Sequence, residues 1–394
     1  MRPLTGITVV DLTRVLAGPF CTMLLADMGA EVIKIEDSRG GDDVRSFPPL
    51  AHGWSSYFLG LNRNKKSVAL DLKTSGGQDA LRRLVSRADV VVENFRPGGL
   101  ARLGFGYEAA REQNPRLIYC SISGYGQTGP RAPLSGYDPV IQAECGLMSI
   151  TGFPDGPPTR SGVAITDFLA GLYANQGILL ALLNRVQTGT GQHIDIALFD
   201  SMLSTLSMPV GILEATGRDP QRLGNEHPSI APYEVFQGHD GLIMICAGND
   251  RLWRSLCEVI GREDLVEDPQ FLTNADRVGH RAALRRELQS AFSDLEVEDL
   301  MTRLESRSVP CGRVRSVADA ISDPQVRARD MLLTLDVPGL GAFRVPGNPV
   351  KMSGVSPGPP CSPPRLGEHT DSVLQSLGYS EKEIDTITQR TVPA

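Results

Sequence analysis

Short β-branched runs alternate with helical stretches over the first 125 residues, and this alternation restricts the fold more than any other feature. Residues 7–12 and 31–36 have the composition of buried strands, and the stretch 14–28 between them is helical. Five further segments repeat the pattern, as strands at 67–71, 89–93 and 117–122 and helices at 77–87 and 107–113. Strands separated by helices predict an α/β fold with a parallel, helix-covered sheet.

The first strand-to-helix turn lacks the glycine pattern of dinucleotide-binding proteins. Residues 13–19 read Thr-Arg-Val-Leu-Ala-Gly-Pro, whereas the usual pyrophosphate cradle is G-x-G-x-x-G. Glu36 ends the second strand, where such proteins place a ribose-binding acid, but one acid does not define a site. The opening is therefore Rossmann-like in its elements without predicting a bound dinucleotide.

The pattern of predicted elements changes near residue 217 and again near residue 328, which divides the chain into three segments. We expect residues 1–216 to be the first part of a large Rossmann-like domain and residues 217–328 to be a smaller α+β domain. Residues 329–394 are then a linker and a C-terminal return to the large domain.

Three kinds of feature are expected in the small domain and in the segment after it. A hairpin is predicted at 233–246, around the turn Gly238-His239-Asp240-Gly241. Extended linkers are predicted near 217–232 and 337–364, and two short helices follow the proline-rich tail.

Composition limits the partners and the compartment. The chain has 394 residues, 41% of them hydrophobic, as in a soluble globular protein, and its net charge of -7 argues against a nucleic acid as partner. Seven scattered cysteines without a C-x-x-C pair fit a reducing, cytoplasmic location. The six histidines show no zinc-binding spacing, so no metal is expected. We expect neither a signal peptide nor a membrane span, because polar residues and two glycines interrupt the longest apolar run.

Asp167 is a lone carboxylate between two apolar segments, a predicted strand at 162–166 and a predicted buried helix over 168–183. Either Thr166 or Asp167 falls in the first turn of that helix. Unpaired amides and the helix dipole favour negative charge there, so we expect Asp167 to be ionised although half-buried. Two roles fit, the commoner helix cap and a nucleophile that attacks an acyl group and forms a mixed anhydride.

Seven motifs occur in order between residues 7 and 372. They are Leu12–Pro19, Gly29–Glu36, Asn62–Ser67, Glu93–Gly98, Ser123–Gly126, Ile165–Asp167 and Leu366–Thr370. Together they resemble the class III CoA-transferases, a family that includes formyl-CoA:oxalate, carnitine and succinate-linked dicarboxylate CoA-transferases and is related to α-methylacyl-CoA racemase. The resemblance implies a Rossmann-like domain made from both ends of the chain, a smaller domain between them, and an interlocked homodimer.

The resemblance also implies the chemistry. Asp167 matches the catalytic aspartate of the family, and capping is compatible with that role. CoA would move from an acyl-CoA thioester to a free carboxylate through an aspartyl anhydride and an aspartyl-CoA thioester. One thioester replaces another of similar energy, so neither a metal nor a tightly bound cofactor is needed, and coenzyme A is a substrate moiety. Agreement with the succinate-linked members favours a dicarboxylate, whose distal end would meet Arg45 or Arg222.

Matching positions imply a set of CoA-binding residues in the turns after the first, third and fourth strands. They are Leu16, Ala17, Leu70, Lys73, Asn94, Phe95 and Arg102. CoA carries a 3′-phosphate and a pyrophosphate, and Arg102 follows a turn that can present a helix start to phosphate. Arg63, Lys65 and Lys66 are either phosphate ligands or a solvated basic surface.

Tyr137 and Asp138 separate two chemistries. In the racemase a histidine stands at the position of Tyr137, and tyrosine is a far weaker base at neutral pH. Racemisation of a 2-methylacyl-CoA is therefore the disfavoured alternative to transfer, and a non-catalytic CoA-binding protein is a third possibility. Asp138 either orients the nucleophile or assists acid–base steps, or it caps a helix before Pro139.

Substrate contacts are also expected from the middle of the chain. Each transfer step passes through an oxyanion, and the turn Gly224-Asn225 is the candidate source of stabilising amides. The formyl-CoA member of the family has a longer glycine run there. His227, Tyr233 and His369 are candidates for substrate contact, although a lone histidine is more often structural.

Overall fold

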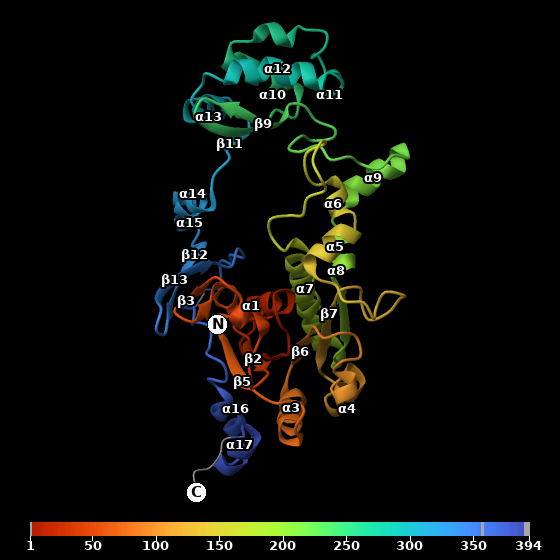
Figure 1. Ribbon diagram of the computed structural model, residues 1–394, viewed down its shortest axis with the longest axis vertical. Coiled ribbons are helices and arrows are strands. Elements are labelled where there is room, and N and C mark those ends of the chain that lie inside the picture. The colour runs from red at the N-terminus through yellow and green to blue at the C-terminus, as the bar shows by residue number, and fades with distance from the viewer. Residues whose placement is uncertain (1, 356–357, 390–394) are drawn as a thin grey trace. The chain divides into compact units, whose positions relative to one another are not determined.

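The structure, a computed structural model, describes residues 2–355 and 358–389, which form two compact units (Figure 1). The first unit takes the described residues of segments 1–147, 160–211 and 325–394, and the second takes residues 148–159 and 212–324. Both terminal segments therefore belong to the first unit, and a short piece before Asp167 belongs to the second.

A six-stranded parallel sheet forms the centre of the first unit. In spatial order its strands are β5 (Lys65–Ala69), β2 (Glu31–Glu36), β1 (Thr8–Asp11), β6 (Val90–Glu93), β7 (Ile118–Ser123) and β8 (His193–Ala197). Numbered along the chain, this is the 3-2-1-4-5-6 order of the doubly wound dinucleotide-binding fold. The predicted α/β fold with a parallel sheet is confirmed. The order reverses between β1 and β6, where such sheets bind ligands beyond the carboxyl ends of their strands.

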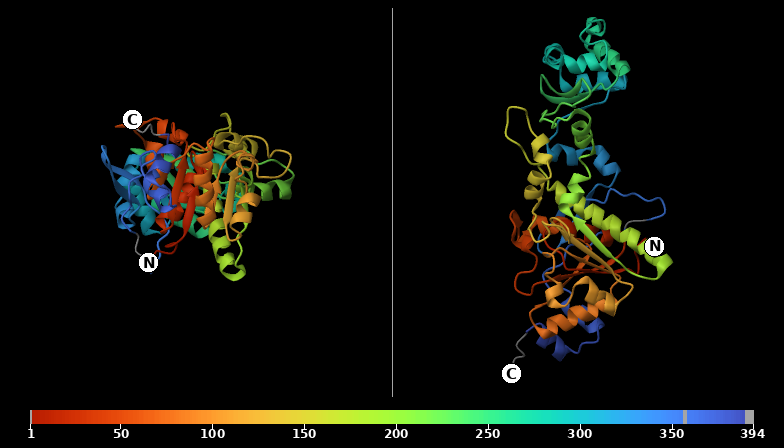
Figure 2. Two further views of the ribbon diagram at one scale, coloured as in Figure 1. Left: turned by 90° about the horizontal axis from the view of Figure 1, so that it is seen from below. Right: turned by 90° about the vertical axis from the view of Figure 1, so that its right-hand side faces the viewer.

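Helices cover both faces of the sheet. On one face, α3 (Ser75–Arg87), α4 (Tyr107–Gln113), α16 (Thr370–Ser376) and α17 (Glu381–Ile387) share an apolar core with alternate strand residues. On the other, α1 (Ala17–Asp27) contacts β1 and β2, and α7 (Ile165–Thr188) contacts β7 and β8. Figure 2 shows the long yellow-green α7 beside β8.

Helices α1 and α7 approach each other closely enough to require a glycine. A Cβ atom at Gly171 would lie 2.6 Å from the carbonyl oxygen of Ala17. One turn earlier on α7, the ring of Phe168 meets that of Phe20 edge to face, with centroids 4.9 Å apart. The first turns of α7, which carry Asp167, are thereby fixed against the start of α1.

Replacing Gly171 by Ala is expected to lower the free energy of unfolding by about 1–3 kcal/mol, because the new methyl group overlaps the Ala17 carbonyl oxygen. Urea denaturation measures the change. Gly211→Ala in α9 (Ser207–Thr216) is the matched control, since its methyl group meets nothing within 4 Å, and it should be neutral or stabilising. Equal stability of Gly171→Ala and the unmodified protein would contradict the described helix contact.

The C-terminal segment covers the open edge of the sheet at β5. The amide of Gly367 donates to Ser67 Oγ (2.9 Å), and Ala69 N donates to Thr370 Oγ1 (3.0 Å). Ser67 and His369 form two hydrogen bonds. The amide of His369 donates to the carbonyl oxygen of Ser67, and the amide of Ser67 donates to His369 Nδ1 (3.3 Å). The Leu366–Thr370 motif therefore protects a sheet edge, and its histidine has a structural role.

The first unit also contains short elements outside the central sheet, and two expectations about this unit are wrong. The short elements include β3 (Leu50–Ala51), β4 (Trp54–Ser55), α2 (Ser56–Leu61), α5 (Asp138–Glu144), α8 (Leu198–Leu203), α15 (Pro324–Ala328), β12 (Leu332–Val337) and β13 (Gly341–Pro346). The expected extended linker over 337–364 is wrong for residues 337–346, because Gly339 adopts φ +80° and closes a hairpin of β12 and β13 that buries Leu335 and Val345. Residues 347–355 and 358–364 carry no helix or strand, and residues 356–357 lie outside the described residues. The predicted strand before Asp167 is also wrong, since α7 already begins at Ile165.

The second unit packs helices on a three-stranded antiparallel sheet of β11 (Cys311–Arg313), β10 (Gly241–Cys246) and β9 (Tyr233–Gly238). The β9–β10 pair is the hairpin expected from the sequence. Its helices include α10 (Asp250–Ile260), α11 (Asn274–Gly279), α12 (Arg281–Phe292), α13 (Val297–Ser306) and α14 (Val317–Ser322). The apolar faces of α10, α12 and α13 meet the sheet in a core centred on Phe236, Trp253 and Phe292.

Candidate active site

A cavity of about 330 Å³ opens beyond the carboxyl ends of β1, β6 and β7, at the point where the strand order reverses. Its walls are the segments 14–17, 94–97, 122–124 and 134–137, together with Asp43, Asp167 and Leu198. Six of the predicted site residues therefore line one cavity, namely Leu16, Ala17, Asn94, Phe95, Tyr137 and Asp167.

A second cavity of about 220 Å³ adjoins the first, because Arg14 and Phe95 line both. It lies beyond the carboxyl ends of β1, β2 and β5, and its lining includes the predicted Leu70 and Lys73. Arg102 is exposed in a short 3-10 helix, Ala101–Leu103, and lines neither cavity. The pair of cavities can hold an elongated ligand, with Lys73 in the compartment further from Asp167.

Asp167 is the third residue of α7 and is half-buried. Burial and, secondarily, the negative charge of Asp138 raise the pKa of Asp167 to about 7. The expected ionised carboxylate is therefore only about half of the population at neutral pH. The helix start favours the charge, but the loss of water and the second carboxylate outweigh it, and the group exchanges a proton in the physiological range.

Asp138 is buried and caps α7 from outside that helix. Its Oδ1 accepts hydrogen bonds from the amide (2.9 Å) and the hydroxyl (2.7 Å) of Thr166, and its Oδ2 accepts one from Gln142 Nε2 (2.7 Å). Gln142 in turn accepts a hydrogen bond from the amide of Ser161 (2.8 Å). The carboxylate thus fixes the turn that presents Asp167, and it does not cap its own helix.

Asn94 fastens the first turn to the neighbouring strand. Its Oδ1 accepts a hydrogen bond from Arg14 N (2.9 Å), and its Nδ2 donates one to Arg14 O (2.8 Å). The next turn begins α1, whose Ala17 and Gly18 amides make no hydrogen bond of standard geometry within residues 2–355 and 358–389; the turn at Val15–Leu16 gives one of them a looser contact with the Arg14 carbonyl. The weakly bonded amide of Ala17 therefore lies at a wall of the cavity that holds Asp167, and the amide of Gly18 follows it in the chain.

The two arginines predicted to meet a distal carboxylate are both already bound. Arg45 forms two 2.7 Å hydrogen bonds to Glu36, and its guanidinium lies 3.7 Å from the centroid of the Phe58 ring. This pairing also occupies Glu36, the suspected ribose acid. Arg222, in the second unit, donates to the carbonyls of Phe153, Pro154 and Gly156. Both arginines therefore stabilise loops.

Neither proposed role fits Arg63 and Lys65, because both side chains are buried. Arg63 forms two hydrogen bonds to Asp27 (2.9 and 2.7 Å), and Lys65 Nζ lies 3.0 Å from Asp11 Oδ2. They are interior ion pairs, and only the neighbouring Lys66 remains exposed, paired with a surface glutamate.

Gly224, Asn225 and His227 lie in the second unit. The amide of Gly224, predicted to stabilise an oxyanion, donates instead to the carbonyl of Gly152 (2.9 Å). The ring of His227 packs 5.2 Å from that of Tyr233, and its Nδ1 accepts a hydrogen bond from a nearby amide. These contacts give Gly224 and His227 a structural use within their own unit.

Sequence reasoning missed the cations of the first cavity, Arg14 and Arg96, and the backbone approach that closes one wall. A Cβ atom at Gly124 would lie 2.6 Å from the Cα of Gly136, so glycine at both positions lets two loops touch. The glycine of the Ser123–Gly126 motif was a usable signal. Nothing local in the sequence pairs it with Gly136.

Within the described residues, no group of three or more histidine, cysteine or acidic side chains is arranged to hold a metal ion. Cys145 is buried, and burial raises the pKa of its thiol, as in a packed side chain rather than a nucleophile.

Comparison with known proteins gives a consistent result over nearly the whole chain. The sequence profile of CoA-transferase family III matches residues 4–370. The chain is 45% identical to an acetyl-CoA:oxalate CoA-transferase of Acetobacter aceti, over 89% of this chain and 90% of that protein. It is 42% identical to a succinate–glutarate CoA-transferase of Agrobacterium fabrum, over 96% and 97% of the two chains.

A solved structure agrees with these sequence relatives. A CAIB/BAIF family protein from Brucella suis superposes with a TM-score of 0.86 at 41% identity, covering 95% of this chain and 99% of that one. The profile match, the relatives and the fold with its ligand-sized cavity at the strand-order reversal together lead to one assignment: the chain is a member of CoA-transferase family III.

Proposed function

We propose that this enzyme moves CoA between an acyl-CoA thioester and a free dicarboxylate through covalent intermediates on Asp167. The observation that carries the proposal is the placement of Asp167: a half-buried carboxylate with a pKa near 7, in a cavity at the ligand-binding edge of the sheet. Burial weakens solvation of the carboxylate, which favours attack on a carbonyl. The adjoining cavity with Lys73 supplies room and a cation for the nucleotide end of CoA.

The proposed cycle has four steps, and each bond that breaks is balanced by one that forms. An ionised Asp167 oxygen attacks the donor carbonyl, and CoA leaves as a thiolate. The thiolate then attacks the Asp167 carbonyl of the anhydride, which releases the donor acid and leaves an aspartyl-CoA thioester. The acceptor carboxylate attacks that thioester, CoA leaves again, and the thiolate finally takes the acceptor acyl group from the second anhydride. Asp167 is regenerated as a carboxylate.

We assign stabilisation of the oxyanions to the start of α1. The cavity wall includes Leu16 and Ala17, and the Ala17 and Gly18 amides make no hydrogen bond of standard geometry in the described part of the chain. Amides and a helix dipole fixed before the reaction stabilise a developing negative charge without reorganisation. Asp138 acts behind the site as the residue that positions Asp167, through its hydrogen bonds to Thr166.

The printed activities of the relatives guide the substrate class. Oxalate, succinate, glutarate and, in a relative from Haloarcula hispanica, mesaconate are all dicarboxylates. A second carboxylate needs a cation inside the site. Arg14 and Arg96 line the cavity with Asp167, and neither has an ion-pair partner among the described residues. We propose that they share the distal carboxylate and the CoA phosphates.

A matrix of acyl-CoA donors and free acids, analysed by mass spectrometry of the CoA products, tests this proposal. Succinyl-CoA with C4 to C6 dicarboxylates should give new thioesters, whereas monocarboxylates of equal length should give few. Transfer restricted to monocarboxylates would overturn the dicarboxylate assignment. Deuterium incorporation at C2 of a 2-methylacyl-CoA without any acceptor acid would favour the racemase alternative instead.

We further propose a homodimer, interlocked as the family resemblance implies. Among the described residues, α7 is the one helix long and apolar enough to cross a membrane by length and composition. Only 33% of its most apolar 18-residue stretch is buried. Its open side carries Leu172, Leu180, Leu183 and Val186, exposed by 49%, 57%, 65% and 85%. A second copy of the chain would cover this surface. The seven cysteines are all free thiols, which supports a reducing, cytoplasmic compartment.

The double substitution Leu180→Asp with Leu183→Asp is expected to convert the dimer to a monomer, because two buried charges without partners cost several kcal/mol. Light scattering coupled to size-exclusion chromatography measures the mass. Val317→Asp, at an 80% exposed site on α14, is the control and should leave the mass unchanged. A dimer that survives both charges on α7 would rule out this surface as the interface.

A further inference from the structure

The turn between β1 and α1 is held in a strained shape. Val15 has φ +67°, a left-handed conformation that is costly for a β-branched residue. Such a conformation persists only where its surroundings impose it. Val15 lines the cavity that holds Asp167 and lies two residues before Ala17, where α1 begins. The shape of this residue therefore sets where the first α1 amides lie.

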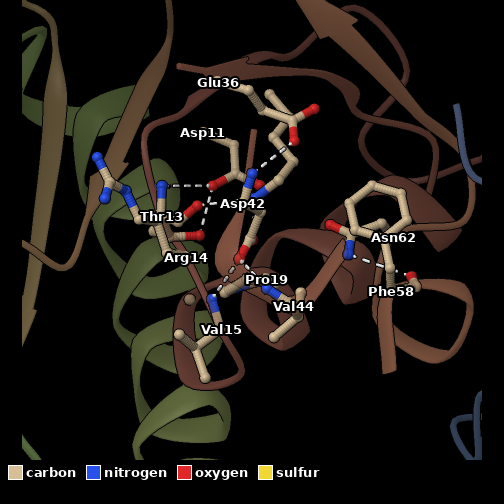
Figure 3. Close-up of polar contacts among 12 residues, drawn as sticks. Asp11, Thr13, Arg14, Val15, Pro19, Glu36, Asp42, Val44, Phe58 and Asn62 are labelled. Carbon is tan, nitrogen blue, oxygen red and sulfur yellow. Dashed lines mark hydrogen bonds and ion pairs between the residues drawn. The ribbon is translucent and has the colours of Figure 1, made fainter. Parts of the chain in front are cut away.

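A buried set of four alternating charges lies against the turn, and Figure 3 labels its two acids, Asp11 and Asp42. Its members are Asp11, Lys34, Asp42 and Lys65, each exposed by 4% or less. Two ion pairs join them, Lys34 Nζ to Asp42 Oδ2 (2.9 Å) and Lys65 Nζ to Asp11 Oδ2 (3.0 Å). Their charges cancel, so the set can remain ionised away from water.

Each of the four groups also bonds to the turn or to the first turn of α1. Lys34 Nζ donates to the carbonyl of Thr13 (2.7 Å), and Lys65 Nζ donates to that of Pro19 (2.9 Å). Asp11 Oδ1 accepts hydrogen bonds from the amide and hydroxyl of Thr13 (2.9 and 2.5 Å).

Asp42 makes the contact with the strained residue itself. Its Oδ1 accepts a hydrogen bond from the amide of Val15 (3.1 Å), and the same oxygen accepts one from Val44 N (3.2 Å). Figure 3 shows this carboxylate between Val15 and Val44. The Val44 bond anchors Asp42 at the start of a 3-10 helix, Asp43–Ser46.

We propose that Asp42 is a positioning residue for the transfer reaction: it holds Val15 in the left-handed conformation and so aims the Ala17 and Gly18 amides at the oxyanion formed on or beside Asp167. The inference rests on the proposed function, which assigns the oxyanion to those amides. Donors that are aimed only at a developing charge affect turnover more than ground-state binding.

The decisive experiment is a double-mutant cycle of Asp42→Asn with Val15→Gly, read as kcat and as KM for succinyl-CoA. Asp42→Asn should lower kcat by roughly tenfold or more, with KM changed by less than about threefold. Glycine adopts a positive φ without strain, so in the Val15→Gly protein the turn keeps its shape without the hydrogen bond from residue 15 to Asp42. Adding Asp42→Asn to the Val15→Gly protein should therefore lower kcat by less than about threefold.

Asp89→Asn is the matched control, because it removes a half-buried carboxylate that pairs with Arg185 away from both cavities. It should lower the melting temperature without changing kcat. If Asp42→Asn does not fold, Asp42→Glu carries the test, since it keeps the charge opposite Lys34 and displaces only the oxygen that binds Val15. Unchanged kcat in either folded variant, an equal loss in both Val15 backgrounds, or failure of both variants to fold would overturn the inference.

Failure of the inference and failure of the proposed function are separable in the same series. Asp167→Asn is measured alongside the Asp42 variants. An inactive Asp167→Asn protein with unaffected Asp42 variants leaves the function standing and removes the positioning role. A fully active Asp167→Asn protein removes the proposed function.

Discussion

Replacing Asp167 by Asn is expected to lower kcat by roughly three orders of magnitude or more, because the amide cannot form the anhydride or the thioester. The change is nearly isosteric, so the two cavities should keep their shape, and the Kd for free CoA should stay within about threefold. Steady-state kinetics with succinyl-CoA and a dicarboxylate acceptor measure the first quantity, and isothermal titration with CoA measures the second. Turnover at the level of the unmodified enzyme would exclude Asp167 as the nucleophile.

The same variant should be more stable than the natural protein at alkaline pH. The pKa of Asp167 is raised from 3.8 to about 7 on folding, so the folded state holds this proton more tightly than the unfolded state. The contribution of the Asp167 proton to the free energy of unfolding is therefore fully present below about pH 4 and is lost as the pH rises through about 7. Asparagine cannot ionise, and at pH 8 the variant should gain about 1–3 kcal/mol, allowing for partial exposure. The gain should narrow toward pH 4.

Activity should fall steeply on the acid side of neutrality, the second large effect. Only the ionised Asp167 can attack, and its pKa near 7 places the acid limb of kcat/KM there. At two pH units below that pKa, about 1% of the alkaline rate should remain. An acid limb near pH 4, the ordinary range of a carboxylate, would contradict the described environment of the group.

Asp138→Asn separates the two causes of this shift. Burial, the larger cause, remains in the variant, and the negative charge of Asp138 is removed. The acid limb should therefore move to lower pH without reaching the range of an exposed aspartate. Glu144→Gln is the matched control on the same helix, because Glu144 pairs with Arg131 and Tyr125 and should leave the limb unchanged.

Much of the large unit could be predicted from sequence because its signals are local. Each strand is a short β-branched run, each helix between strands shows its own period, and Gly29 marks the end of the first helix. The 233–246 hairpin was readable for the same reason, since its turn residues lie between two apolar runs. The β12–β13 hairpin was not, because glycine and proline at 338–341 are equally typical of a linker.

Part of the lining of the candidate cavity could be named from the sequence, whereas its electrostatics could not. Asp167, Asn94 and the 13–19 turn stand in motifs that sequence resemblance finds. The pKa of Asp167 depends on burial, which only the packing of the chain creates, and on the charge of Asp138. Asp138 lies 28 residues before Thr166, to which it is hydrogen-bonded at the start of α7. The substrate-binding roles expected for Arg45 and Arg63 were not found for a similar reason. Arg45 pairs with Glu36 and Arg63 pairs with Asp27, and no local spacing in the sequence reveals these contacts.

The measurement that tests the central claim most directly is chemical trapping of the covalent enzyme. The protein is incubated with succinyl-CoA, quenched with hydroxylamine, digested and analysed by tandem mass spectrometry. The account predicts a hydroxamate at Asp167 in the natural protein and none in Asp167→Asn, because both the anhydride and the thioester react with hydroxylamine. Active enzyme that carries no hydroxamate at Asp167, or carries it on a different residue, would contradict the account.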